Sequence, residues 1–162
     1  MELFEDPRLT AMGLIVETHE GLAAKTAPAL SEHGLSSVDF DALIRLARTP
    51  GRRLRMSDLA AQTAFSTSGI TRVVDRLERG GLVIRESCPH DRRTSYAALT
   101  EAGAKRLAEV VPQHLLDLDR WLTGLLTPEQ LTALLDALRV IRDHVRPCAT
   151  AGSDLAARTA EP

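Results

Sequence analysis

Residues 66–100, STSGITRVVDRLERGGLVIRESCPHDRRTSYAALT, constrain the fold more than any other part of the chain. Their first half repeats apolar residues with the helical period of about 3.6 residues, at Ile70, Val73, Val74 and Leu77. Gly80 and Gly81 end that helix, and the alternating segments LVIRES and TSYAAL predict two strands around the loop CPHDRRT. We therefore expect a helix followed directly by a β-hairpin.

The segment before this unit predicts the elements that complete it. RRLRMSDLAAQTAF, residues 52–65, predicts a short extended piece and then a short helix capped by Ser57. Ser36 and Asp39 resemble a capping box that opens an earlier helix, which a Thr-Pro-Gly sequence ends. Two helices joined by a tight turn and followed by a hairpin are typical of a winged helix-turn-helix, which we place at about residues 36–99.

Long helices are expected on both sides of this unit. Asp6 followed by proline predicts the start of a helix over about residues 7–32, which Pro28 is expected to kink or stop. Thr-initiated helices are expected over about residues 100–146, with a bend at Pro112. Their apolar stripes are too extensive for one small unit to cover, so we expect these helices to dimerise.

The expected fold is mainly α with a small β-hairpin wing, in which the winged helix-turn-helix lies between long dimerisation helices. Residues 1–146 are expected to form a single domain. Residues 147–162 are rich in Ala, Thr, Gly, Ser and Pro, a composition that predicts a flexible tail.

Charge is unevenly distributed along the chain, although its formal net value is only −2. Residues 42–106 carry thirteen basic and six acidic side chains, a net charge of +7, whereas both flanking segments are net acidic. A basic middle between acidic ends is typical of a nucleic-acid-binding unit, although an uneven solvated surface would give the same pattern.

Cysteine content and hydropathy limit the cellular context. Cys88 and Cys148 provide neither a disulfide framework nor zinc-ligand spacing. The acidic N-terminal segment lacks the character of a signal peptide, and no apolar stretch approaches the roughly 20 residues that span a bilayer. We therefore expect a soluble cytoplasmic protein with no cofactor and no membrane partner.

The helix that begins near residue 66 has a polar face opposite its apolar positions. That face carries Thr67, Ser68, Thr71, Arg72, Asp75 and Arg76. Small hydroxyl residues in a first turn let a helix approach the major groove of DNA, and an arginine one turn later has the planar fork that contacts guanine. Together with the arginines of the hairpin loop, this face favours DNA binding over an ordinary solvated helix.

SGITRVVDRLERGGLVIRE followed by DRRTSYAALT resembles the MarR family of bacterial winged-helix regulators. The most specific part is the wing pattern of Asp91, then Arg93, then Leu99 and Thr100 at the end of the second strand. Ala97 replaces the aliphatic residue usual at one position, which is expected to loosen the strand packing. The resemblance covers residues from about 7 to 146.

The resemblance implies a homodimer, a ligand-responsive repressor, that binds a pseudo-palindromic operator with its recognition helices in successive major grooves. Carried over by position, the base-reading candidates are Thr67, Ser68, Thr71 and Arg72, with Arg76 on the same face. Arg92 is the wing-tip residue expected in the minor groove, and Asp91 with Arg93 is the pair expected to hold the shape of the wing. Arg53 and Arg55 are candidate phosphate contacts, which the sequence does not separate from a general basic patch.

The resemblance also implies an effector pocket between the DNA-binding lobe and the dimerisation helices. His19, Phe40 and Arg45 are candidates to line it, for a phenolic or other aromatic effector. His19, on an otherwise apolar stripe, fits a packed interface histidine at least as well. The identity of the effector stays open, as do the target promoter and the choice between repression and activation.

Other functions remain as alternatives. Cys88, beside three arginines, is a candidate redox-sensing thiol, although the family's usual sensing cysteine lies in the first helix, where this chain has none. Cys88 with His90, and His114 with Asp117, provide too few ligands for a zinc site. His114 and Asp117 also resemble a base and its orienting group, but no nucleophile or phosphate-binding loop accompanies them, so we do not expect an enzyme. A non-regulatory DNA-binding protein would bind without operator preference.

Overall fold

The computed structural model describes residues 2–63, 65–88 and 91–147, with the side chains of residues 2–3, 88 and 91–93 outside that description. Its helices and strands, in chain order, are η1 (Glu2–Glu5), α1 (Pro7–Glu32), α2 (Ser37–Ala47), η2 (Pro50–Arg52), β1 (Arg53–Arg55), α3 (Met56–Thr63), α4 (Thr67–Arg79), β2 (Val83–Cys88), β3 (Asp91–Leu99), α5 (Glu101–Trp121), η3 (Thr123–Leu125) and α6 (Pro128–Val145). This order confirms the predicted mainly helical fold with a hairpin wing. The expected tail lies outside the described residues, apart from its first residue.

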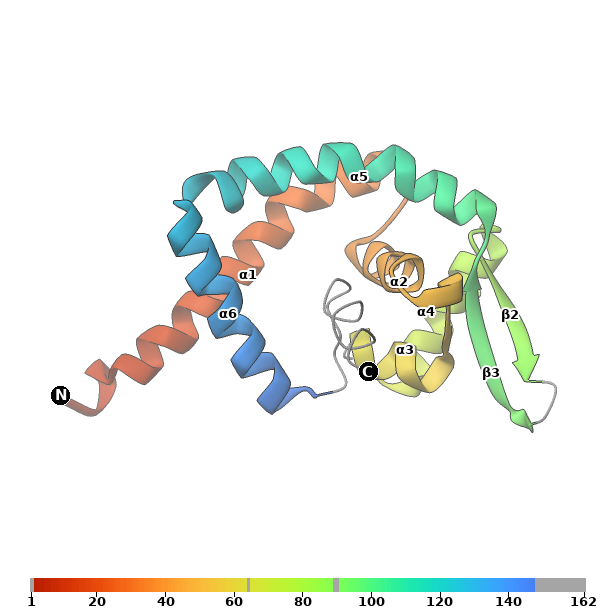
Figure 1. Cartoon of the computed structure of the whole chain (residues 1–162), viewed down its shortest axis with the longest axis horizontal. Coiled ribbons are helices and arrows are strands. Elements are labelled where there is room, and N and C mark those ends of the chain that lie inside the picture. Colours follow the sequence, from red (N-terminus) through yellow and green to blue (C-terminus); the bar gives the residue numbers. More distant parts are fainter. Residues whose placement is uncertain (1, 64, 89–90, 148–162) are drawn as a thin grey trace, which may run out of the picture.

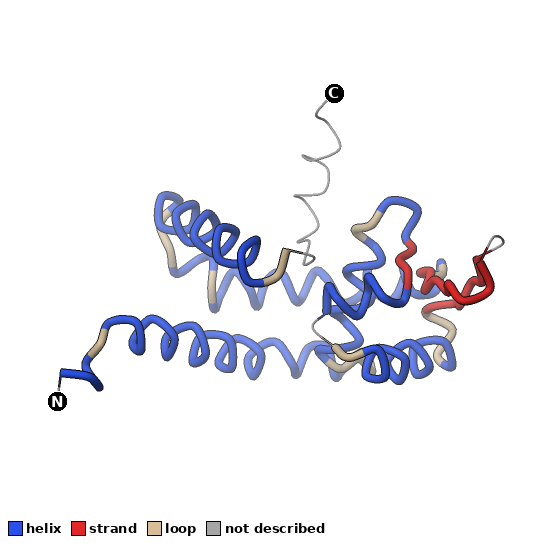
Figure 2. Tube along the Cα trace, turned by 90° about the horizontal axis from the view of Figure 1, so that it is seen from below, coloured by secondary structure: helices blue, strands red, loops and turns tan. Residues whose placement is uncertain are grey.

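The molecule has two parts, which differ in shape (Figure 1). We call α2 to β3 the lobe, and α1 with α6 the arms. Helix α5 runs along the top of the view and joins the lobe to the arms. The hairpin of β2 and β3 lies on the side of the lobe away from the arms. Figure 2 shows the strands gathered at one end of the molecule and the N-terminus of α1 at the other.

A continuous apolar core fills the lobe. It comprises Leu30, Leu35, Ala42, Leu43, Leu46, Leu54, Leu59, Ala60, Ile70, Val73, Val74, Leu77, Leu82, Val83, Ala97, Leu107 and Val110. The predicted apolar positions of α4 are all among them, because one stripe of an amphipathic helix must be buried. Leu107 and Val110 come from α5, so the first half of that helix closes the core from above.

The sheet has the order β1-β3-β2, with both pairings antiparallel. Ala97 lies opposite Leu54 of β1 and Arg85 of β2 and is fully buried. Gly103, in the first turn of α5, lies so close to the carbonyl oxygen of Leu82 that a Cβ atom there would collide with it. The start of α5 is therefore seated directly on the sheet.

One detail of the predicted helices was wrong, the cap of α3. Helix α1 continues through Pro28 to Glu32, within the predicted range, so Pro28 does not stop it, and a kink there stays a prediction. Helix α3 begins at Met56, so Ser57 lies in its first turn and is not the cap. The reason is that β1 runs into α3 without an intervening residue. Helix α5 also continues through Pro112.

The arms bury little of their apolar surface. Within α1, all of which the structure describes, Thr26 and Leu30 are the buried residues, and α6, also fully described, has none. Their large exposed apolar residues are Leu9, Met12, Leu14, Ile15, Val16, Leu135, Leu138, Val140, Ile141 and Val145. Among the helices of the described residues, none combines the length and the hydropathy that a membrane span requires.

Polar contacts connect the arms to the rest of the chain. The guanidinium of Arg106 in α5 donates to the carbonyl oxygen of His33 at 2.7 Å, just beyond the end of α1. Lys25 and Arg120 each lie 4.7 Å from the ring centre of Trp121, so a cation–π contact joins α1 to the end of α5. Arg146, after α6, donates to the carbonyl oxygen of Ala61 in α3.

Candidate nucleic-acid interface

Helix α4 presents the polar face that the sequence predicted. Ser66 caps the helix by accepting a hydrogen bond from the backbone N–H of Gly69 at 3.1 Å. Thr67, Ser68 and Arg72 are exposed, whereas Thr71 is half-buried and donates to the carbonyl oxygen of Thr67 at 2.8 Å. The described part of the chain therefore leaves the first two turns of α4 open to a ligand.

Arg76, on the same face, is held by an ion pair with Asp39 of α2. Its Nη2 atom lies 2.6 Å from Oδ1 of Asp39, and its Nε atom also donates to that carboxylate. Asp39 is almost fully buried and completes the predicted capping box with Ser36. Burial alone would raise the pKa of Asp39, but the hydrogen bonds from Arg76 and Ser36 outweigh it and hold this pKa below its ordinary value. The structural role of Arg76 is thus clear, and its contact with DNA stays a prediction.

A second ion pair connects α4 to the wing. The Nη2 atom of Arg85 in β2 lies 2.6 Å from Oδ1 of Asp75 and donates to the carbonyl oxygen of Thr71 at 3.3 Å. The backbone N–H of Arg85 donates to the carboxylate of Glu78 at 3.2 Å. Sequence reasoning missed this role of Arg85, because the residues pair across the Gly80–Gly81 turn at a separation that no helix or strand period marks.

Arg53 and Arg55, the candidate phosphate contacts, lie on β1 beside Tyr96 of β3. The guanidinium of Arg53 lies 4.7 Å from the centre of the tyrosine ring and pairs with Glu86 at 3.3 Å. Arg55 donates from Nε to the hydroxyl of Tyr96 at 3.3 Å. Tyr96 therefore orients both arginines, although the sequence analysis did not single it out. The signal that could have identified it is an aromatic residue on the strand opposite a basic one.

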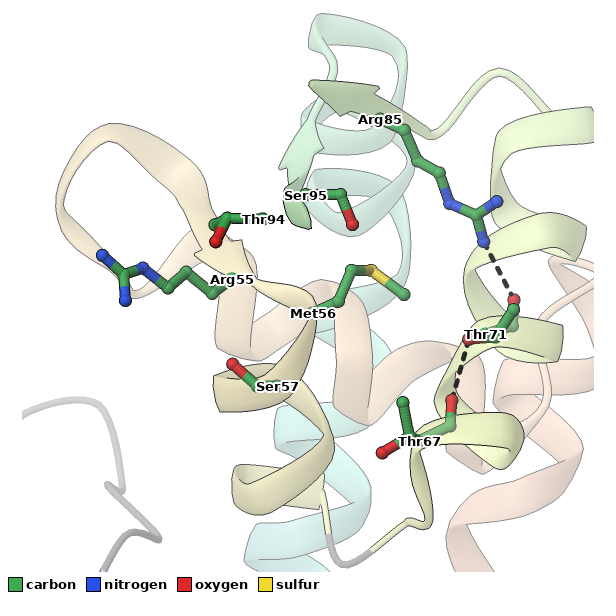
Figure 3. Close-up of a pocket in the computed structure, with 8 residues that line it drawn as sticks. All are labelled: Arg55, Met56, Ser57, Thr67, Thr71, Arg85, Thr94 and Ser95. Atoms are coloured by element: carbon green, nitrogen blue, oxygen red, sulfur yellow. Dashed lines mark hydrogen bonds between the residues drawn. The ribbon is translucent and has the colours of Figure 1, made fainter. Parts of the chain in front are cut away.

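A cleft separates α4 from the wing (Figure 3). Its volume is about 440 Å³, and it is lined by Arg55, Met56, Ser57, Thr67, Thr71, Arg85, Thr94 and Ser95. These residues come from β1, α3, α4, β2 and β3. The structure thus brings the predicted phosphate contact Arg55 to the same hollow as two predicted base-reading residues.

The tip of the wing carries several predicted residues whose side chains lie outside the described part. For the backbone, Cys88 pairs with Asp91 after an irregularity between Ser87 and Cys88. The roles predicted for Asp91, Arg92, Arg93 and Cys88 stay predictions. His90 lies outside the described residues altogether. Within the described residues, no group of three or more His, Cys, Asp or Glu side chains is placed to hold a metal ion.

The candidate effector residues lie in different surroundings. His19 is exposed on α1, and Arg45 donates to Asp41 within α2 at 3.1 Å. Phe40 packs against His114 of α5 with ring centres 4.5 Å apart. The Nδ1 atom of His114 is buried without a hydrogen-bond partner among the described residues, and burial lowers the pKa of this imidazole. Sequence reasoning considered His114 only as a base or a metal ligand.

Known proteins with similar sequences and structures identify the family. A model described as MarR family matches residues 33–94. Over 116 residues, 70% of this chain and 74% of the relative, the chain is 33% identical to YkoM, an uncharacterised HTH-type transcriptional regulator of Bacillus subtilis (strain 168). Over 86 residues, 52% of this chain and 49% of the relative, it is 35% identical to the transcriptional repressor MprA of Escherichia coli (strain K12).

A solved structure extends the likeness to nearly the whole chain. Sco3205, a MarR family transcriptional regulator from Streptomyces coelicolor crystallised in complex with DNA, is 31% identical and superposes with a TM-score of 0.79. The match covers 86% of this chain and 88% of that one. The relatives of this chain named above are transcriptional regulators and not enzymes, in agreement with the sequence prediction. The chain belongs to the MarR family and is a DNA-binding transcriptional regulator.

Proposed function

We propose that this regulator is a ligand-responsive repressor that binds a pseudo-palindromic operator as a homodimer in the cytoplasm. The observation that carries the proposal is the open polar face of α4, with Thr67, Ser68 and Arg72 exposed beside a cleft and a wing. Repression is supported by the likeness to MprA, a transcriptional repressor, and DNA contact by the likeness to Sco3205, solved with DNA.

Each protomer then places α4 in a major groove and its wing in the adjoining minor groove. Arg72 reads a base through its guanidinium fork, with Thr67, Ser68 and Thr71 close to the groove floor. Arg92 enters the minor groove, where an A·T-rich tract concentrates negative potential. Arg53 and Arg55, oriented by Tyr96, contact phosphates of the backbone.

The dimer forms through the arms. Helix α1 exposes large apolar residues from Leu9 to Val16, and α6 exposes them from Leu135 to Val145, an arrangement that a monomeric protein seldom keeps. A two-fold axis between the arms of two copies places the two α4 helices on successive major grooves. The effector is an aromatic compound that binds between lobe and arms, where Phe40 packs on His114, with His19 and Arg45 as further candidates.

The experiment that tests this function compares DNA duplexes by fluorescence anisotropy. One duplex carries the part of the intergenic sequence beside the protein's own gene that the protein protects in a footprinting experiment. The other duplex has a random sequence of the same length. The Arg72→Ala variant is expected to lose about 1–3 kcal/mol per half-site on the first duplex, with relaxed preference at one base pair.

A charge-matched control is Arg139→Ala, on α6, which is expected to bind both duplexes like the wild type. If Arg72→Ala weakens binding to both duplexes by the same factor, Arg72 is a phosphate contact and does not read a base. If the wild-type protein shows no preference between the duplexes at any salt concentration, the operator-binding function is wrong.

A further inference from the structure

Helices α5 and α2 meet at a contact between a histidine and a phenylalanine. The ring centres of His114 and Phe40 lie 4.5 Å apart, with the rings tilted by 54°. Phe40 also packs against the apolar core of the lobe. The Nδ1 atom of His114 is buried and has no hydrogen-bond partner among the described residues. A titratable side chain thus lies inside the junction between a helix of the lobe and the helix that joins the lobe to the arms (Figure 1).

The closed junction suits the neutral imidazole. A protonated histidine carries a positive charge and an N–H donor on each ring nitrogen. Protonation would therefore leave Nδ1 as a buried donor without an acceptor in the part of the chain that the structure describes, which is costly. Burial accordingly lowers the pKa of His114. To take up a proton, the ring has to leave its place against Phe40 and reach water.

The charged groups on α5 and α1 do not offset this cost. Asp117, one turn along α5, is the charged group that acts on the imidazole, and its effect on the pKa of His114 is smaller than that of burial. Its carboxylate also accepts a hydrogen bond from Gln113 at 3.1 Å. On α1, which packs along α5, Lys25 lies over the ring of Trp121. The neutral form of His114 therefore stays favoured in the closed junction.

On α2, the charged residues beside Phe40 are both held in ion pairs. Asp41 pairs with Arg45 of the same helix at 3.1 Å. Asp39 pairs with Arg76 of α4 at 2.6 Å. Two consecutive residues of α2 thus contact the recognition helix and α5, Asp39 the former and Phe40 the latter. A displacement of α2 from α5 would therefore move the carboxylate that holds Arg76, and α4 with it.

We propose that His114 is a proton-operated switch of DNA affinity. The neutral ring keeps α2 closed against α5, and uptake of a proton opens this junction and moves α4 out of its binding position. The inference rests on the proposed function, since it requires operator binding by α4. It needs no effector compound, because the proton itself is the ligand that the two states bind differently.

The direction of the pH effect distinguishes this switch from simple electrostatics. Because DNA binds the closed form, it competes with the proton at His114, and affinity declines as the pH falls below 6.5, the ordinary pKa of the group. Simple electrostatics gives the opposite sign. Each of the five histidines of the chain gains positive charge on acidification, which tightens binding to phosphates.

The test measures affinity for the footprinted operator duplex by fluorescence anisotropy, from about pH 7.5 to about pH 5 at fixed salt. Each protein's affinity at the lower pH is divided by its own affinity at the higher pH. For the wild type, we expect a decline of about tenfold or more, because each protomer of the dimer takes up a proton at His114. His114→Phe, which keeps a ring against Phe40, and His114→Gln, which keeps a neutral polar group, should hold their affinity or gain.

The matched control is His144→Gln, which changes an exposed histidine of α6 and should decline like the wild type. Circular dichroism at each pH checks that the helices stay folded. The inference alone fails if the wild-type affinity is constant or rises on acidification, if both His114 variants decline in parallel with the wild type, or if the decline only follows unfolding. If the wild type shows no preference for the operator over the random duplex at the higher pH, the proposed function fails, and the inference with it.

Nuclear magnetic resonance gives a second measurement, which does not depend on comparing variants. The pKa of His114 is measured from its ring-proton resonance with and without bound operator. Because coupling between two ligands is reciprocal, bound DNA should lower the pKa of His114 further. An equal pKa in the two states would overturn the inference even if the affinity changes with pH.

Discussion

The lobe and the arms are built from similar amounts of apolar residue but use it in opposite ways. In the lobe, the apolar positions of α2, α3, α4 and the sheet enclose one another, and most of them are buried or partly buried. In the arms, Leu9, Met12 and Val140 are more than half exposed. The lobe thus closes its own core, whereas the arms have apolar faces that remain uncovered within one protomer.

This difference suits the lobe and the arms to different tasks. A core that is complete within one protomer holds the recognition face of α4 and the wing in a fixed relation, through the Arg76–Asp39 and Arg85–Asp75 ion pairs. Arms that are not complete by themselves are suited to set the distance between two such lobes. Substitutions of buried residues in the lobe should therefore cost the folding stability of each protomer, whereas substitutions on the apolar faces of the arms should act on the pairing of two copies.

The largest effect is expected for Gly103→Ala, where α5 is seated on the lobe. The new Cβ atom would collide with the carbonyl oxygen of Leu82 and lie 2.7 Å from Cδ1 of Leu99. Because that carbonyl belongs to the backbone, helix and sheet must separate, at a cost of about 3 kcal/mol in unfolding free energy. Urea unfolding followed by circular dichroism measures it, and an unchanged midpoint would show that α5 is not seated there.

The next largest effect is expected for Arg76→Ala. It leaves the carboxylate of Asp39, only 5% exposed, without its charged partner. Since the Arg76 side chain is itself 50% exposed, we expect a loss of about 2 kcal/mol, below the range for a fully buried pair. Arg79→Ala, one turn further along α4, is the control and should change stability by less than about 0.5 kcal/mol. Equal losses in the two variants would contradict the structural role of Arg76.

A smaller effect concerns pH, through His114 where α5 meets α2. Burial lowers the pKa of His114 below its ordinary value of 6.5, so the folded chain favours the neutral imidazole. The unfolded chain takes up the proton first as the pH falls through 6.5, so stability that is complete above that value declines below it. Asp39, whose pKa is lowered, loses its contribution only below its ordinary value of 3.8.

Denaturant unfolding between about pH 7.5 and about pH 5 isolates the histidine from Asp39. The wild type should lose stability across this range, and His114→Phe, which keeps a ring against Phe40, should lose less. Parallel declines in the two proteins would show that His114 does not carry the effect.

The smallest effect is expected for Gly21→Ala, the counterpart of Gly103→Ala in the arms. A Cβ atom at Gly21 meets nothing within 4 Å, so only helix propensity changes, and we expect a gain of about 0.5–1 kcal/mol. Thermal unfolding of the two glycine variants side by side gives the sharpest contrast between lobe and arms. A destabilised Gly21→Ala protein would mean that α1 is tightly covered at this point.

Much of the fold was predictable from local signals. The caps at Asp6, Ser36, Thr100 and Thr127 and the turn at Gly80–Gly81 mark element ends by hydrogen bonding within a few residues, and the structure has all of them. The apolar period of α4 likewise identified its buried stripe. Such signals act within one helix or turn, which is why they appear in the sequence.

The pairings across elements were not predictable in the same way. Arg76 with Asp39, Arg85 with Asp75, and His114 with Phe40 join residues whose separations follow from packing angles rather than from any helical or strand period. The sequence therefore identified Arg76 as an exposed polar residue but did not show its ion pair. The cleft itself is formed by five separate elements, and no single stretch of sequence predicts it.

Sedimentation equilibrium of the intact protein at micromolar concentration tests the central claim, that the arms need a second copy, most directly. We expect a single species of about twice 17.6 kDa, because the pairing of two copies would cover the exposed apolar faces of α1 and α6. A species of 17.6 kDa at that concentration would contradict it, and the two-fold operator model would fail with it.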